Sequence, residues 1–137
     1  ELTNYATPYD DLVQQVVNRV RRHRLQDKVL LSSFHPANLV KARRLMPEVP
    51  VAILALKGTA GAVARSFVGR WLSPEYVHPY YSDVNERWMQ RQHALSRKVN
   101  VWTVNQPVDI SALLRWGVDG IITDDPRLAR QIMEESR

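Results

Sequence analysis

Short apolar runs alternate with amphipathic segments along the whole chain. Continuous or nearly continuous apolar runs occupy residues 29–34 and 51–56, and two more, at 99–105 and 120–123, end in polar groups. Tyr76-Val77-His78 is a weaker candidate of the same kind. Strands that are apolar on both faces are typical of parallel sheets covered by helices, so this pattern predicts buried parallel strands.

Helical periodicity fills the intervals between these runs. Predicted helices cover residues 9–24, 36 to 46, 84–95, 109–116 and 126 onward. Pro36 and Pro126 suit the first turn of a helix, and Asp125 suits the capping position before it. The pattern therefore repeats strand and helix from one end of the chain to the other.

The long segment between Lys57 and Pro74 has two interpretations. In the favoured one it supplies a crossover helix, and its apolar residues pack on the strands: Phe67, Val68, Trp71 and Leu72. In the other, its beginning is a mobile lid that contacts the substrate.

Repeated strand–helix units predict a parallel α/β sheet with right-handed crossovers. The chain has 137 residues, whereas a complete (β/α)8 barrel needs about 250. Two architectures are therefore compatible with the pattern: part of such a barrel, and an open doubly wound sheet. The dinucleotide-binding version of the open sheet is disfavoured because no Gly-x-Gly-x-x-Gly follows a strand.

Composition excludes several classes of function. The chain has no cysteine, which rules out disulfides and thiolate metal sites, and its apolar runs are too short to span a bilayer. The net charge is +5, and four arginines cluster at positions 19, 21, 22 and 24. They fit the solvated carboxyl end of a helix better than a nucleic-acid patch, since no aromatic residues interleave with them. No nucleic-acid partner is expected.

Candidate chemistry lies at the predicted strand ends, where α/β folds place their reacting groups. These ends carry Glu1, Ser33-Phe34-His35, Lys57, His78, Trp102 to Asn105, and Thr123-Asp124-Asp125. The residues alone indicate a polar pocket with one to three carboxylates and a lysine. Asp125 is explained as a helix cap, and Asp124 is not expected to be a ligand.

Several of these segments match one known family in order and spacing. The chain resembles the later part of a glycerophosphodiester phosphodiesterase domain in Glu1-Leu2-Thr3-Asn4, Ser33-Phe34, Trp102-Thr103-Val104-Asn105 and Gly117 to Pro126. The resemblance implies a partial (β/α)8 TIM barrel, from the end of the third strand through the eighth strand and the final helix. Residues 1–137 would then form the C-terminal portion of a single barrel domain.

The resemblance also implies an activity, which is metal-dependent hydrolysis of a glycerophosphodiester to glycerol 3-phosphate and an alcohol. Glu1 matches a metal-ligating glutamate, and a carboxylate-bound Mg²⁺ or Ca²⁺ is expected. Trp102 matches an aromatic residue at the barrel mouth, and Phe34 an apolar wall beside it. Thr3 stands where the family usually has a phosphate-contacting lysine. Lys57 is the candidate to replace that charge, and the alternative interpretation is that Lys57 is an ordinary loop cation.

The departures from the family concern catalysis. The family's two catalytic histidines and its paired Glu-x-Asp ligands belong to segments upstream of the position matched by Glu1. We therefore expect no catalytic residue in this chain, an inactive fragment, and an active full-length parent. The last third also resembles members with a membrane-embedded N-terminal region, which implies membrane attachment through a region outside these residues.

Three other expectations follow. A non-catalytic module that binds phosphorylated or anionic ligands is the alternative function, and an unrelated small α/β domain is a second. An incomplete barrel leaves sheet edges and apolar surface exposed, so we also expect self-association.

Overall fold

Five parallel strands form one sheet in the order β1-β2-β3-β4-β5. The computed structural model describes residues 1–7, 10–65, 72 and 74–136. The strands are β1 (Leu31–Ser33), β2 (Val51–Ala55), β3 (Tyr76–Pro79), β4 (Lys98–Val101) and β5 (Gly120–Ile121). The weak candidate at Tyr76-Val77-His78 is thus the central strand.

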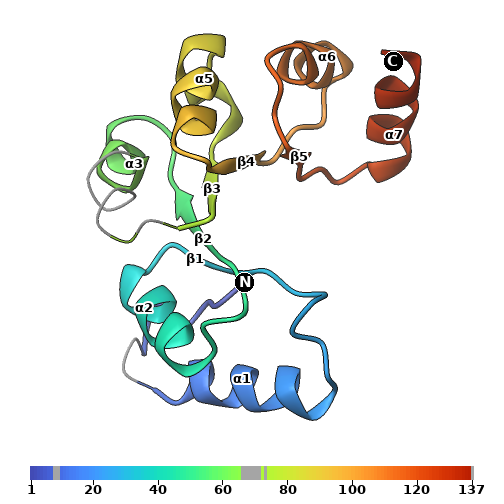
Figure 1. Ribbon diagram of the computed structural model, residues 1–137. Helices are drawn as coiled ribbons and strands as arrows, with labels where there is room; N and C mark the ends of the chain where they lie inside the picture. The colour runs from blue at the N-terminus through green and yellow to red at the C-terminus, as the bar shows by residue number, and fades with distance from the viewer. Residues whose placement is uncertain (8–9, 66–71, 73, 137) are drawn as a thin grey trace.

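The helices lie on one side of this sheet. They are α1 (Leu12–Arg22), α2 (Pro36–Leu45), α3 (Thr59–Val63), α5 (Glu86–Ala94), α6 (Pro107–Arg115) and α7 (Pro126–Glu135), with a 3₁₀ turn η2 (Tyr81–Asp83). Figure 1 shows them fanned around the convex side of a curved sheet. The strands follow one another without reversal, so crossovers of one hand place the helices of the described residues on the same side. This is the topology of a partial barrel, and it excludes the doubly wound alternative.

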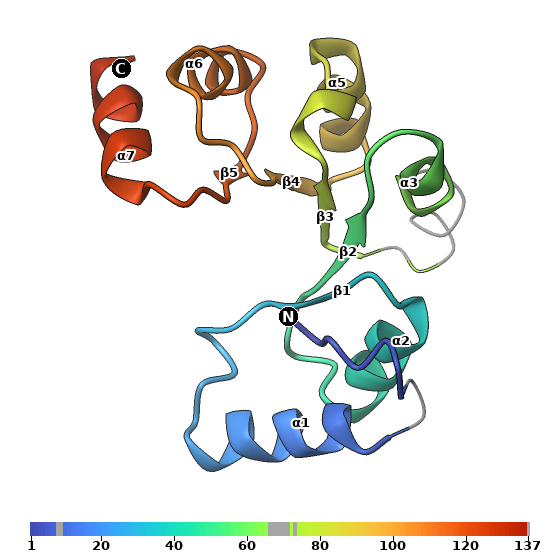
Figure 2. The ribbon, with the colours of Figure 1, turned by 180° about the vertical axis from the view of Figure 1, so that it is seen from behind.

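The first residues extend the sheet beyond β1. The backbone N–H of Leu2 donates to the Ser32 carbonyl at 2.8 Å, and the Ser33 hydroxyl donates to the Leu2 carbonyl at 2.9 Å. The Leu2 side chain is buried. Figure 2, seen from behind, shows this amino-terminal segment beside β1.

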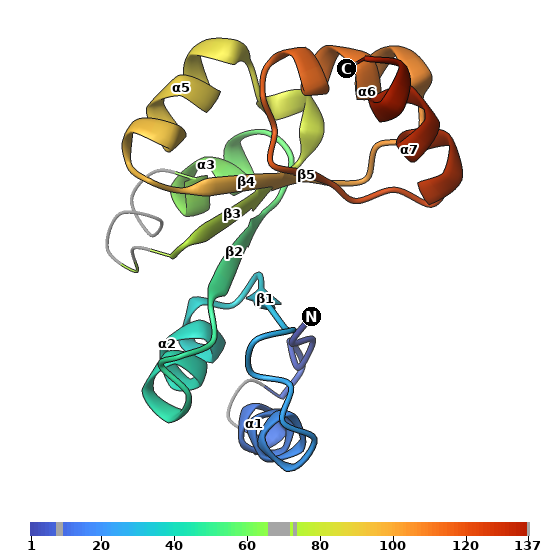
Figure 3. The same cartoon turned by 45° about the vertical axis from the view of Figure 1, so that its right-hand side comes forward.

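Two apolar clusters pack the helices on the outer face of the strands. One joins α1 and α2 to β1, β2 and β3, with Val17, Leu39 and Ile53 fully buried. The other joins α5, α6 and α7 to β4 and β5, with Met89 and Val99 at its centre. Figure 3 shows these helix groups on either flank of the strands. Because side chains alternate along a strand, the residues between these outward positions face the concave side.

Helix boundaries differ from prediction for local reasons. The helix predicted over 9–24 begins at Leu12 and ends at Arg22, and residues 8 and 9 lie outside the described residues. The Asp10 carboxylate accepts the Leu12 N–H at 3.0 Å, and the left-handed φ of 53° at Arg24 ends the turn. The helix predicted from residue 109 begins earlier, at Pro107, because proline suits the first helical position.

Four of the five strands are shorter than predicted, whereas β3 continues one residue further, to Pro79. The strand predicted over 99–105 ends at Val101, and Trp102 adds only an isolated bridge to Tyr80. In the segment after Lys57, helix α3 confirms the beginning of the predicted crossover, and Leu72 is buried in the first apolar cluster, as predicted. Phe67, Val68 and Trp71 lie outside the described residues.

No helix within the described parts of the chain combines the length and the apolar character needed to cross a bilayer.

Candidate functional site

The carboxyl ends of four strands meet at one edge of the sheet. Phe34 follows β1, Lys57 follows β2 by two residues, Tyr80 follows β3 and Trp102 follows β4. Because the strands are parallel and adjacent, these side chains belong to the same edge. We call it the carboxyl edge.

Four rings at the carboxyl edge form a chain of edge-to-face contacts, here called the aromatic cluster. The ring centroids of Tyr5 and Phe34 are 6.0 Å apart, those of Phe34 and Trp102 are 5.6 Å apart, and those of Trp102 and Tyr80 are 5.4 Å apart. The interplanar angles of 70°, 85° and 85° are those that aromatic quadrupoles prefer.

A charged group lies at each end of the aromatic cluster. The Lys57 ammonium lies 5.2 Å from the centroid of the Tyr80 ring, and the Tyr5 hydroxyl donates to the Glu1 carboxylate at 2.8 Å. The structure therefore connects Glu1, Phe34, Trp102 and Lys57, the four residues singled out from the sequence, through the rings of two tyrosines.

Hydrogen bonds hold Trp102 in place. Its indole N–H donates to the His78 carbonyl at 2.7 Å, and its own carbonyl accepts the Tyr81 N–H at 3.1 Å. Its backbone N–H donates to the Pro79 carbonyl at 3.3 Å. The end of β3 thus fixes the orientation of Trp102, one of the two inner rings of the aromatic cluster.

The His78 side chain lies on the concave face and is buried. Burial lowers the pKa of His78 to about 4, so its imidazole is neutral at pH 7. His78 Nε2 lies 3.1 Å from the Asn100 amide nitrogen, which can only donate, so Nε2 is the acceptor. This imidazole is engaged in packing the concave face.

The other histidines have varied surroundings. His35 lies between Phe34 and the first residue of α2, and its Nδ1 is buried without a hydrogen-bond partner among the described residues. His93 pairs with Asp119 at 3.0 Å, and Asp119 also accepts the N–H of Val99 in β4. His23 is exposed at the end of α1.

Polar residues after β4 and β5 bind each other. The Asn105 side chain accepts the Thr123 hydroxyl and the Asp124 N–H, each at 3.0 Å, and donates to the Asp124 carboxylate at 2.7 Å. Asp125 caps α7 by accepting the Leu128 N–H at 3.0 Å, as predicted. These groups join two loops and start a helix.

The carboxylates of this chain fit a metal site only in part. Across the described residues, no three His, Cys, Asp or Glu side chains gather into a group that could hold a metal ion. Glu1 brings one carboxylate to the aromatic cluster, whereas Mg²⁺ and Ca²⁺ sites need several oxygen ligands. These residues alone do not make a cation site.

Tyr5 and Tyr80 were missed in the sequence. Tyr80 could have been found, because residues 76, 78 and 80 alternate along one strand and share the face of His78. Tyr5 lies in an irregular turn after Leu2, and nothing in the local pattern points to it.

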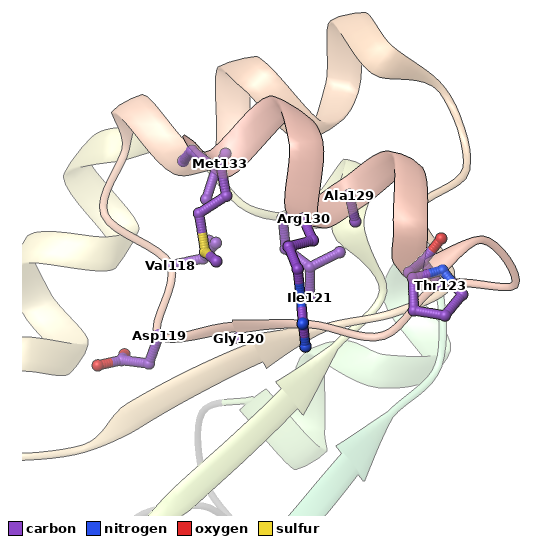
Figure 4. Close-up of a pocket in the computed structure, with 10 residues that line it drawn as sticks. Val118, Asp119, Gly120, Ile121, Thr123, Ala129, Arg130 and Met133 are labelled. Carbon is purple, nitrogen blue, oxygen red and sulfur yellow. The ribbon is translucent and has the colours of Figure 1, made fainter. Parts of the chain in front are cut away.

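A groove of about 240 Å³ lies elsewhere, between β5 and the helices α6 and α7. Figure 4 shows Arg130 and Met133 of α7 directed toward β5 across this groove. Its lining is mainly apolar and contains no member of the aromatic cluster. The groove and the carboxyl edge are therefore separate features.

Fold and site together define a partial (β/α) barrel with its candidate site at the carboxyl ends of the strands. The model of the glycerophosphoryl diester phosphodiesterase family matches residues 3–128, and the chain belongs to this family.

Relatives extend this assignment. A glycerophosphodiester phosphodiesterase of Bacillus altitudinis is 29% identical over 139 residues, covering 100% of this chain and 56% of the relative. One from Caldanaerobacter subterraneus is 24% identical, covering 92% and 51%. The chain spans about half the length of the curated relatives it matches.

Solved structures agree on the fold. A candidate glycerophosphoryl diester phosphodiesterase from Silicibacter pomeroyi superposes with a TM-score of 0.83 at 30% identity, covering 91% of this chain and 44% of its own. An Oleispira antarctica phosphodiesterase, solved with its product sn-glycerol-3-phosphate, has a TM-score of 0.77 at 22% identity. That alignment covers 90% of this chain and 49% of the other. Both match the partial TIM barrel.

Proposed function

We propose that the whole protein hydrolyses glycerophosphodiesters to glycerol 3-phosphate and an alcohol. The observation that carries this proposal is the aromatic cluster with Lys57 at one end, at the carboxyl edge of a chain that belongs to the family. A cation beside apolar ring surface suits a ligand that joins a phosphate to a carbon chain.

Different residues bind different parts of the substrate. Lys57 is exposed, and its ammonium binds the phosphate oxygens. Phe34 and Trp102 contact the carbon part of the diester, as wall and mouth of the site. Thr3 cannot supply a positive charge, so Lys57 carries it.

A divalent cation is part of the proposal. Glu1 supplies one ligand, and the remaining carboxylates come from outside these residues. Such a cation, when bound, neutralises negative charge on the phosphoryl oxygens. Chelation of divalent cations is expected to abolish turnover by the whole protein, and Mg²⁺ or Ca²⁺ to restore it. Full turnover in excess chelator contradicts this part of the proposal.

Lys57→Ala tests the substrate site. In the whole protein, we expect this change to raise KM for a glycerophosphodiester about tenfold, because a charge-assisted bond to phosphate is lost, while kcat changes little. Release of glycerol 3-phosphate gives the readout. Lys28→Ala, at an exposed position before β1, is the control and is expected to leave KM unchanged. An unchanged KM in Lys57→Ala contradicts the role of Lys57.

The 137 residues alone are proposed to be inactive. They contain four histidines, of which His78 is hydrogen-bonded to Asn100 and His93 is paired with Asp119. No family motif places any of the four in a catalytic role. This observation also favours the second candidate function, an anion-binding module. Binding of glycerol 3-phosphate without turnover by the whole protein would select the module.

A further inference from the structure

We propose that Arg65 and Asp83 form a clamp that positions Lys57 and so sets the affinity of the carboxyl edge for a phosphate-bearing ligand. The inference rests on the proposed function, since it explains how the phosphate-binding cation is held. Neither Arg65 nor Asp83 needs to contact the ligand, so both are positioning residues.

The centre of the clamp is one carboxylate oxygen. Asp83 Oδ2 accepts from Arg65 Nη1 at 2.6 Å and from the backbone N–H of Gly58 at 2.6 Å. The Arg65 and Asp83 side chains are each only 14% exposed. The Arg65–Asp83 bond is partly buried and charge-assisted, so it restrains this loop more than an exposed ion pair would, and the more exposed Gly58 N–H adds a second short bond to the same oxygen.

Arg65 also holds the backbone on both sides of Lys57. Its Nη1 donates to the Leu56 carbonyl at 3.0 Å, and its Nη2 donates to the Gly58 carbonyl at 2.9 Å. The Leu56 carbonyl belongs to the peptide group before Lys57, and the Gly58 N–H belongs to the one after it. With both peptide groups restrained, the direction of the Lys57 Cα–Cβ bond is fixed.

Two glycines make this arrangement feasible. Gly58 has a left-handed φ of 69°, which residues other than glycine rarely adopt. A Cβ at Gly61 would lie 1.7 Å from the Leu56 carbonyl oxygen and 2.7 Å from Arg65 Nη1. The first of these contacts is with backbone, so any side chain at position 61 would force the clamp apart.

The clamp also joins two strand ends. Asp83 lies in η2, the turn that directly follows Tyr80, and the Lys57 ammonium lies over the Tyr80 ring. Restraining the loop after β2 against this turn therefore holds the ammonium beside the aromatic cluster. Because the charges of Arg65 and Asp83 cancel, Lys57 supplies the net positive charge there.

Substitutions at Asp83 separate positioning from simple electrostatics. Asp83→Ala removes a negative charge near the site, so electrostatics alone predicts tighter binding of an anion. The clamp predicts the opposite, a Kd for glycerol 3-phosphate raised about tenfold, as in Lys57→Ala. Titration calorimetry on the whole protein gives the sign directly.

Arg65→Lys gives a second test that preserves charge. Lysine keeps the cation but lacks the fork that reaches two carbonyls, so the clamp predicts weaker binding and a raised KM with little change in kcat. In the Lys57→Ala background, Arg65→Lys is expected to add no further loss. If Asp83→Ala fails to fold, Arg65→Lys still carries the test.

The opposite end of the sheet offers a matched control. Glu75 accepts from Arg43 Nη2 at 3.1 Å and from the Val51 N–H at 3.1 Å, which resembles the clamp but lies before β3. Glu75→Ala is expected to leave Kd and KM unchanged. Tighter or unchanged binding in Asp83→Ala, or an unchanged Kd in Arg65→Lys, overturns the clamp.

The same experiment separates the clamp from the proposed hydrolysis. If glycerol 3-phosphate binds more weakly to both clamp variants but the wild type does not hydrolyse the diester, the proposed hydrolysis is wrong and the clamp stands. Turnover in wild type with no effect of the clamp variants removes the clamp alone. A wild type that neither binds glycerol 3-phosphate nor turns over removes both.

Discussion

At the scale of the residue, the concave face is organised around His78. Its imidazole accepts from Asn100, and its carbonyl accepts from the indole of Trp102. Gly120 leaves room for this arrangement, because a Cβ there would lie 2.5 Å from Asn100 Oδ1. His78 thus contacts Asn100 through its imidazole and the Trp102 indole through its backbone carbonyl.

This histidine predicts a pH dependence of stability. The pKa of His78 falls from 6.5 to about 4 on folding, through burial, so the unfolded chain binds more protons between these values. The contribution of His78 to the free energy of unfolding is therefore fully present above pH 6.5, and it is lost as the pH falls toward 4. By pH 4.5 we expect a loss of about 2.5 kcal/mol from this group.

Urea unfolding at pH 7.5 and pH 4.5 measures this loss. His78→Gln is expected to reduce the difference in free energy of unfolding between the two pH values by about 2.5 kcal/mol. His23→Gln, at an exposed position, serves as the control and should not change it. Equal pH dependence in wild type and His78→Gln would contradict the burial argument.

At the scale of the element, the ends of β4 and β5 are joined through Asn105. The segment after Val101 leaves the strand, and the Asn105 side chain makes three hydrogen bonds to the Thr123-Asp124 loop. This exchange explains why the predicted strand over 99–105 is too long. In the sequence, Asn105, Thr123 and Asp124 were candidates for chemistry at strand ends. In the structure, they connect two loops.

Asn105→Ala tests this connection. Losing three hydrogen bonds, one of them to a carboxylate, is expected to lower the free energy of unfolding by about 2 kcal/mol. Asn18→Ala loses a single exposed helix pair with Gln14 and should cost about 0.5 kcal/mol or less. Chemical denaturation measures both, and equal effects of the two substitutions would count against the connection.

At the scale of the whole molecule, the helices that the structure describes lie on the convex side of the sheet. Figure 1 shows the concave side open. By alternation along the strands, Leu56 and Ile122 face this side, and they are 50% and 42% exposed. Exposed apolar side chains on a curved sheet favour association with further apolar surface.

We expect the 137 residues, prepared alone, to self-associate through the concave side. Ile122→Asp should then weaken association about tenfold or more, because it places a charge in the interface. Val108→Asp, at an exposed apolar position at the start of α6, is the matched control. Sedimentation velocity over a range of concentrations gives the readout. A monomer at every concentration, or equal effects of both substitutions, would contradict this expectation.

Local pattern was sufficient for much of the fold. The apolar runs placed all five strands, and Pro36, Pro126 and Asp125 marked where two helices begin, because strand burial and helix capping depend on neighbours in sequence. Element ends were less predictable. The end of β4, for instance, depends on hydrogen bonds from Asn105 to Thr123 and Asp124, which are distant in the sequence.

The sequence by itself determined the family, the repeated strand–helix order and the identity of Phe34, Lys57 and Trp102 as strand-end residues. Only the tertiary structure decided that Phe34 contacts Trp102, that Tyr80 links Trp102 to Lys57, and that Tyr5 links Phe34 to Glu1. It also decided that Arg65 and Asp83 restrain the loop that carries Lys57. The physical reason is that parallel strands bring distant loops to one edge. Contacts between such loops depend on geometry across the sheet, which has no local signature along the chain.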